Sequence, residues 1–219
     1  MEEYSRYLIL VEGVADQQFL IHYLKHLYGL DFKEVVGNNA VYEASNITLR
    51  YIGGISKLCS RTFINEIQKT EDDGGKVLVV FDADSDYLKQ KECLLTWRDN
   101  QHFYFDLFLF PNDSDNGALE SLLEKIINAQ NQPIFDCWNQ FEETLKGINI
   151  PWKEPDHKPT IPAKKTKIYA YLETLLGDST SQKNLIKERN RNYSNPNHWN
   201  LDTDYILSLK KFFDQFFRQ

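Results

Sequence analysis

The stretch VLVVFDADSD, residues 77–86, decides the fold class, because it joins a continuous apolar run to a set of closely spaced acids. Short apolar runs rich in β-branched residues are typical of strands that are buried on both faces of a parallel sheet. A second run of this kind is YLILV, residues 7–11. The runs at residues 47–52 and 105–110 are also predicted to be strands.

Segments in which apolar residues recur at helical spacing separate these strands. The predicted helices cover residues 16–28, 57–70, 87–100 and 117–128. Residues 31–45 form a polar connection whose structure the pattern leaves open. The alternation of strands and helices predicts an α/β fold, with a parallel sheet flanked by helices on both faces.

The last third of the chain has a different pattern. Helices are predicted at residues 134–145, 164–176 and about 202–217, and an Asn-rich polar stretch at 179–197 precedes the last of them. The aromatic stripe of that last helix is typical of core packing rather than of a membrane or partner surface. We therefore expect an α/β core at residues 1–130 and a mainly helical C-terminal extension at 131–219 that packs on it.

Length and composition limit the functional classes. The chain has 219 residues, 42% of them hydrophobic, which is enough for a full core. It has no apolar stretch long enough for a membrane span and no secretory leader, so we expect a cytoplasmic protein without membrane contact. Cys59, Cys93 and Cys137 are odd in number and widely spaced, which is typical of reduced thiols.

The charge of the chain is distributed unevenly. The net charge is −7, but residues 1–152 hold 13 Lys and Arg against 24 Asp and Glu, a net of −11. Residues 153–193 hold 9 against 5, a net of +4. A protein with an acidic body does not bind nucleic acid through its overall charge. Any phosphate contact would therefore depend on bound metal and on the basic segment at residues 153–193. The alternative is that this segment is simply a solvated face.

Acidic side chains follow two of the predicted strands. Glu12 and Asp16 come after the first, and Asp82 and Asp84 come after the third. Ligands bind beyond the carboxyl ends of the strands in open parallel sheets, so these four carboxylates are expected to converge. They would repel one another there unless they shared a cation, and Mg²⁺ is the usual one.

The order of these motifs resembles the Toprim domain of topoisomerases, bacterial primases, recombination-mediator proteins and OLD (overcoming lysogenization defect) nucleases. A second acid four residues beyond Glu12 is most similar to the OLD type. More narrowly, three further signals resemble a group of small stand-alone bacterial Toprim-like proteins of unassigned function. They are LFPN at 109–112 leading to Gly117, Leu119 and Glu120, KTKIYA at 165–170, and the closing aromatic helix.

The resemblance implies a role for each acid. Glu12 would act as general acid or base and help to hold a metal, and Asp82 and Asp84 would coordinate Mg²⁺ or Mn²⁺. Asp16 and Glu120 would support a second ion. Two ions near one phosphate can orient a water molecule and stabilise the leaving oxygen, so carboxylates suffice for phosphodiester cleavage.

The resemblance also implies a lysine and a partner. Lys165 lies where OLD-type nucleases place a lysine that neutralises charge in the transition state. The chain has no counterpart of the topoisomerases' catalytic tyrosine domain, so DNA strand passage is not expected. It also has no counterpart of the ATPase that accompanies OLD Toprims, so a separate partner ATPase is expected. The function implied is a metal-dependent nuclease, with phage or plasmid defence as its setting.

Two alternatives stay open. A Toprim scaffold without catalysis would bind a partner protein or a nucleic acid. A phosphatase of the haloacid-dehalogenase type would use the DxD at Asp82 and Asp84 as nucleophile and acid/base. That family carries its DxD near the start of the chain, and Glu12 would then have no role.

Several candidate residues also have structural explanations. Asp16 and Asp86 each lie where a helix is expected to begin and would cap it. An exposed acidic helix face explains Glu120 as well as a role as metal ligand does. The solvated start of a helix likewise explains Lys165. His22 and His26 have the i, i+4 spacing of a zinc pair but lack a third ligand in register. A separate pair, Asp113 and Asp115, either enters the metal site or shapes its loop.

Overall fold

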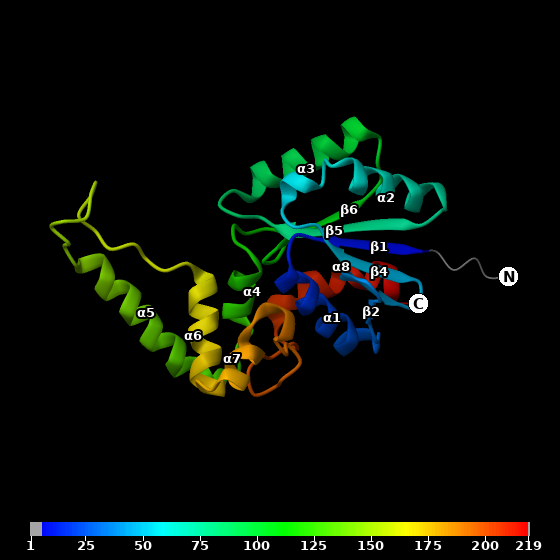
Figure 1. The fold of residues 1–219 in the computed structure, drawn as a ribbon. Helices are drawn as coiled ribbons and strands as arrows, with labels where there is room; N and C mark the ends of the chain where they lie inside the picture. The colour runs from blue at the N-terminus through cyan, green and yellow to red at the C-terminus, as the bar shows by residue number, and fades with distance from the viewer. Residues whose placement is uncertain (1–5, 219) are drawn as a thin grey trace.

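The computed structural model describes residues 6–218 and shows an α/β fold built on a six-stranded mixed sheet (Figure 1). The strand order is β2-β3-β4-β1-β5-β6. The strands are β1 (Tyr7–Val11), β2 (Lys33–Val35), β3 (Asn38–Ala44), β4 (Ile47–Tyr51), β5 (Lys76–Asp82) and β6 (Asp106–Phe110). The strands β4, β1, β5 and β6 run parallel, as the apolar runs predict.

The sheet departs from the predicted parallel arrangement at one edge. Within the polar connection at residues 31–45, β2 and β3 form a hairpin, and β3 continues antiparallel onto β4. The hairpin turns at Gly37, whose φ of 80° suits a glycine. The three residues of β2 are largely exposed, so this edge lacks the apolar run by which the central strands are recognised.

Helices cover both faces of the sheet (Figure 1). On one face lie α2 (Arg61–Asp72) and α3 (Tyr87–Gln101), which pack on Leu8, Val79 and Phe81. On the other face lie α1 (Val14–Tyr28), α4 (Leu119–Lys125) and α8 (Leu207–Phe217). Alternate residues of one strand, such as Leu8 and Ile9 of β1, therefore enter two different cores.

The C-terminal extension joins the second of these cores. The helices α5 (Gln132–Gly147), α6 (Lys164–Leu176) and α7 (Thr180–Ile186) lie to one side of the sheet, and α5 projects away from it (Figure 1). Phe212 and Phe213 of α8 are buried in the core, which confirms the core reading of the aromatic stripe. The predicted helix at 202–217 begins later, at Leu207, after a short 3-10 helix at Asp204–Ile206.

The polar stretch at 179–197 is more ordered than its composition indicates. It contains α7 and a 3-10 helix at Glu188–Asn190. The predicted helix at 117–128 is shorter, since α4 covers Leu119–Lys125; at its start, Gly117 has a φ of 142° and pairs with Asp84 instead of joining the helix. Within residues 6–218, none of the helices combines the length and the apolarity that crossing a bilayer requires.

Candidate functional site

The two acidic strand ends lie side by side, as the sequence predicts. The strands β1 and β5 are parallel neighbours in which Val11 pairs with Val80. Glu12 therefore follows its strand at the same edge of the sheet where Asp82 closes β5. Asp84 lies two residues farther along the same loop.

Glu12 is held in place by the loop that follows β4. Its backbone carbonyl accepts hydrogen bonds from the N–H groups of Gly53 and Gly54, at 2.9 and 3.1 Å. Its carboxylate Oε1 accepts from the Ile55 N–H at 3.4 Å, whereas Oε2 is buried and has no partner within residues 6–218. Burial, with a further contribution from the charge of Asp84, raises the pKa of Glu12 above its ordinary value. One carboxylate oxygen is therefore left for a ligand.

Asp16 caps α1 and also belongs to the acid cluster. Its Oδ2 accepts a hydrogen bond of 2.7 Å from the N–H of Gly13, the residue that precedes the helix. The side chain is buried, and burial raises its pKa to about 8, with added repulsion from Glu120, Glu12 and Glu188. The capping role and the site role are therefore compatible.

Asp82 ties the end of β5 to the start of α4. Its Oδ1 accepts the Leu119 N–H at 2.9 Å. Burial raises the pKa of Asp82 to about 9, and the nearby charges of Asp16, Glu12 and Glu120 contribute. Because desolvation disfavours the charged form, these carboxyls are destabilised as anions unless positive charge reaches them.

A backbone pairing joins the loop of Asp84 to the segment that leads into α4 and Glu120. Asp84, at a φ of 54°, exchanges N–H to carbonyl hydrogen bonds of 2.7 and 2.8 Å with Gly117. A Cβ on Gly117 would lie 2.4 Å from Ser121 Oγ, so the close approach requires glycine. Three residues later, Glu120 lies in the first turn of α4, and its charge acts on both Asp16 and Asp82. All five predicted metal ligands thus gather at one sheet edge.

Lys165, the predicted catalytic lysine, lies close to this cluster but has a partner. It begins α6 and forms an ion pair with Glu188. The hydrogen bond to Glu188 raises the pKa of Lys165, and Glu120 adds to the effect. Its ammonium therefore lies near the acid cluster and is engaged by Glu188, which is not one of the five predicted ligands.

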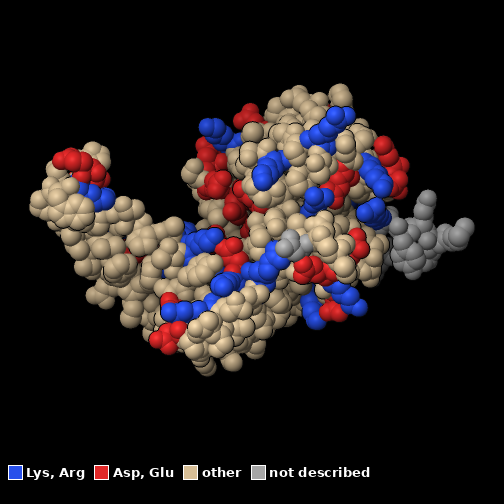
Figure 2. Space-filling model, viewed as in Figure 1, with Lys and Arg blue, Asp and Glu red and all other residues tan. Residues whose placement is uncertain are grey.

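Acidic side chains fill a hollow of the surface between the α/β body (residues 6–130) and the C-terminal extension, and basic side chains border it (Figure 2).

The family model for a protein of unknown function (DUF3226) matches residues 6–218. The chain belongs to this family. The family description names no Toprim domain, so the Toprim resemblance of this DUF3226 chain stays a prediction.

One solved structure is similar to this DUF3226 chain. It is the crystal structure of the hypothetical protein PH0156 from Pyrococcus horikoshii OT3, at 18% sequence identity and a TM-score of 0.48. The match covers 83% of this chain and 86% of that one. No curated protein matches the chain.

Sequence reasoning missed three residues of the extension. Glu188 pairs with Lys165 and acts on Asp16. Arg191 is 3% exposed and donates to the Ile186 carbonyl and to the Tyr193 hydroxyl, the latter at 3.2 Å. Burial raises the pKa of Tyr193, and the charges of Asp16 and Glu120 reach it. The signal available was Tyr193, an aromatic residue within a polar, Asn-rich stretch.

The other acidic candidates shape local structure. Asp86 caps α3 by accepting the Lys89 N–H at 3.1 Å, as predicted. Asp113 forms an ion pair of 3.3 Å with Lys91, and Asp115 accepts from the Asn112 side chain at 2.8 Å. Both therefore stabilise the loop after β6.

The candidate zinc histidines have separate partners. His26 Nε2 lies 2.8 Å from an oxygen of Asp202, and His22 Nδ1 accepts from the Tyr193 N–H at 3.4 Å. Burial lowers the pKa of His22. Within residues 6–218, no group of three or more His, Cys, Asp or Glu side chains is arranged to hold a metal ion. This applies to the carboxylate cluster as well, although its oxygen atoms are the ligands that Mg²⁺ prefers and Glu12 Oε2 has no partner.

Proposed function

We propose that this chain is a Mg²⁺-dependent phosphodiesterase of the Toprim type that acts on nucleic acid. One observation carries the proposal: Glu12, Asp16, Asp82, Asp84 and Glu120 share one sheet edge, where burial and mutual repulsion raise the pKa values of Glu12, Asp16 and Asp82. Buried groups with perturbed pKa values that share a concave region are typical of functional sites.

The carboxylates would have different roles, according to their environments. Asp82 and Asp84 would hold one ion, and Asp16 and Glu120 would support a second. When bound, Mg²⁺ supplies stabilisation of negative charge on the phosphoryl and leaving oxygens. The unpaired Oε2 of Glu12 would exchange a proton with the attacking or leaving group, and burial raises the pKa of this carboxyl above its ordinary value.

Positive charge reaches the site from the extension. Lys165 would contact a phosphate after leaving Glu188, and other lysines of its helix lie nearby. The setting that we propose is cytoplasmic, which agrees with three free, exposed cysteines. Defence against phage or plasmid DNA beside a partner ATPase is the remaining part of the proposal, and it rests on the Toprim resemblance alone.

The test is nicking of supercoiled plasmid with Mg²⁺ or Mn²⁺, alongside calorimetric titration of the same ions. We expect the Asp82→Asn variant to lose nicking by about a thousandfold or more and to bind the ions weakly. Asparagine keeps the oxygen that accepts the Leu119 N–H, so the fold is expected to persist. Asp115→Asn is the matched control, since Asp115 interacts with Asn112 and Ser114 of its own turn.

Equal nicking by the wild type and by Asp82→Asn would refute the proposed enzyme activity. Absence of both ion binding and nicking of DNA or RNA would favour the second candidate, a Toprim scaffold that binds a partner or a nucleic acid, because a scaffold need not bind Mg²⁺. The arrangement of the carboxylates favours that candidate, because it does not form a ready metal site in residues 6–218. A hydroxylamine-sensitive aspartyl phosphate on Asp82 would instead support the phosphatase alternative.

A further inference from the structure

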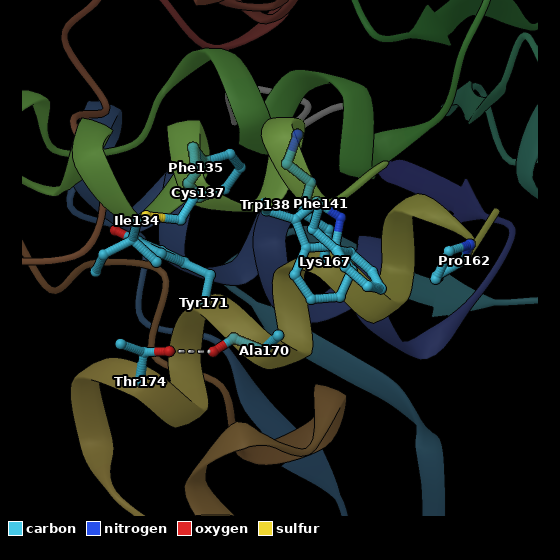
Figure 3. A pocket seen from close by; sticks show the side chains of 10 residues that line it. All are labelled: Ile134, Phe135, Cys137, Trp138, Phe141, Pro162, Lys167, Ala170, Tyr171 and Thr174. Carbon is cyan, nitrogen blue, oxygen red and sulfur yellow. Dashed lines mark hydrogen bonds between the residues drawn. The ribbon is translucent and has the colours of Figure 1, made fainter. Parts of the chain in front are cut away.

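Two lysines at the start of α6 already have acidic partners. Lys165 forms its ion pair with Glu188. Lys167 lies in the lining of the groove between α5 and α6, and its ammonium is 3.4 Å from a carboxylate oxygen of Glu124 (Figure 3). A phosphate that reaches either lysine would first have to displace a carboxylate. A cation that is free to bind the backbone of a nucleic acid must therefore come from another part of the fold.

The loop that follows β4 lies at the same sheet edge as Glu12. The strand β4 is the parallel neighbour of β1 on the side opposite to β5, so the loops after all three strands begin at this edge. The sequence of the loop is GGISK, residues 53–57, and both glycines have a positive φ, at 81° and 108°. This conformation suits glycine, and both N–H groups bond the backbone carbonyl of Glu12. The loop is therefore fixed to the candidate site.

Lys57 ends this loop, and its side chain lies beside the first glycine. The ammonium Nζ is 3.6 Å from the position that a Cβ on Gly53 would occupy. The backbone N–H of Lys57 bonds the carbonyl of Gly54 at 2.9 Å, which holds the residue in place. Its side chain is exposed and has no hydrogen-bond or ion-pair partner among residues 6–218. Lys57 therefore presents an unpaired positive charge next to the loop backbone that binds Glu12.

We propose that Lys57 binds the phosphate backbone of the nucleic acid that occupies the candidate site. The inference rests on the proposed nucleic-acid substrate, and it gives Lys57 a role in binding and not in bond cleavage. The carboxylates of the acid cluster repel a polyanion, and a free ammonium beside Glu12 offsets part of this repulsion. The ammonium of Lys57 can donate to phosphate oxygens without losing a partner, whereas Lys165 would have to leave Glu188.

Fluorescence anisotropy tests this contact, with a labelled DNA duplex and an RNA of the same sequence titrated with the full chain at several salt concentrations. Ca²⁺ replaces Mg²⁺ so that the probes stay intact. We expect Lys57→Gln to bind the preferred probe about threefold to tenfold more weakly, and to make the slope of log affinity against log salt concentration shallower by about 1. Lys69→Gln is the matched control and should bind like the wild type. Lys69 is also exposed and unpaired within residues 6–218, but it lies near the end of α2, close to the start of β5 and the opposite sheet edge.

The salt slope distinguishes a phosphate contact from a structural role, since a weakened fold leaves the number of phosphate contacts unchanged. In the nicking assay, Lys57→Gln should raise KM severalfold and leave kcat unchanged. Equal affinities and slopes for the wild type and Lys57→Gln, an equal loss in Lys69→Gln, or a wild type that binds neither probe would overturn the inference. Weaker binding and a shallower slope in Lys57→Gln, beside a wild type that binds but does not nick, would support the contact and refute the proposed enzyme activity.

Discussion

The acidic side chains of the site in the body and the lysines of α6 in the extension differ in whether they are paired with a group of opposite charge. In the body, Asp16 is buried and Asp82 is partly buried, and within residues 6–218 neither forms an ion pair. In the extension, Lys165 pairs with Glu188, and the buried Lys167 pairs with Glu124 of α4. Unpaired carboxyls that are removed from water cost stability, whereas an exposed paired charge such as that of Lys165 contributes little either way. The difference indicates that the acid cluster is kept at a cost, as expected where function rather than stability selects the residues.

The two regions nevertheless share one core. Trp199 of the extension is 2% exposed, and its ring lies 5.4 Å from that of Tyr171 and 6.0 Å from that of Tyr193. Its backbone forms a β-bridge with Ile127, at the end of the body. The extension is therefore an integral part of the folded unit in the described residues, and the boundary at residue 130 stays a sequence prediction.

The largest expected effect tests this shared core. Trp199→Ala should lower the free energy of unfolding by about 3–5 kcal/mol, because a large buried ring leaves a cavity. Chemical denaturation followed by both circular dichroism and fluorescence measures it, and the two probes should report a single transition. Trp152→Ala is the control, since Trp152 is 82% exposed, and it should change stability by less than about 0.5 kcal/mol. Two separate transitions in the wild type would show that body and extension fold independently.

The next largest effect is the pH dependence of the free energy of unfolding, which the acid cluster is expected to cause. Burial raises the pKa of Asp16 to about 8 and that of Asp82 to about 9, so the folded state holds protons that the unfolded state has lost. Without divalent ions, stability should therefore fall as pH rises from about 5 to 8, by up to about 1.4 kcal/mol per pH unit for each carboxyl.

Denaturation at several pH values in a chelator measures this slope. Asp82→Asn should flatten it and stabilise the protein at pH 8, because the amide has no proton to lose. Added Mg²⁺ should recover stability most at high pH if the cluster binds the ion. A stability that is constant or rises over this range would contradict the burial of ionisable acids here.

The sequence predicted the centre of the fold and of the site better than their edges. The runs at 7–11 and 77–81 became β1 and β5 almost residue for residue, because strands buried on both faces need continuous apolar sequence. The same logic placed Glu12 and Asp82 together. The β2–β3 hairpin escaped because an exposed edge strand carries no such run.

The contribution of the extension to the site also escaped prediction. Glu188 and Arg191 lie in a polar stretch that reads as a loop, and their placement beside Asp16 and Tyr193 depends on how the extension packs back on α1. No local pattern encodes such a long-range contact. The helix at 164–176, by contrast, was predicted residue for residue, since its apolar stripe is local.

The smallest expected effect on stability separates two neighbouring lysines. Lys164 and Lys165 both begin α6 and are similarly exposed, at 57% and 56% of their side chains. Replacing either by methionine should cost less than about 1 kcal/mol, because exposed ion pairs contribute little. If Lys165 leaves Glu188 to neutralise a phosphate, then Lys165→Met should lower nicking about tenfold or more, while Lys164→Met, which loses a contact to Ser121, should not. Equal nicking by the two variants, measured beside equal stabilities, would reduce Lys165 to a structural partner of Glu188 and leave the carboxylates of the body as the whole of the candidate site.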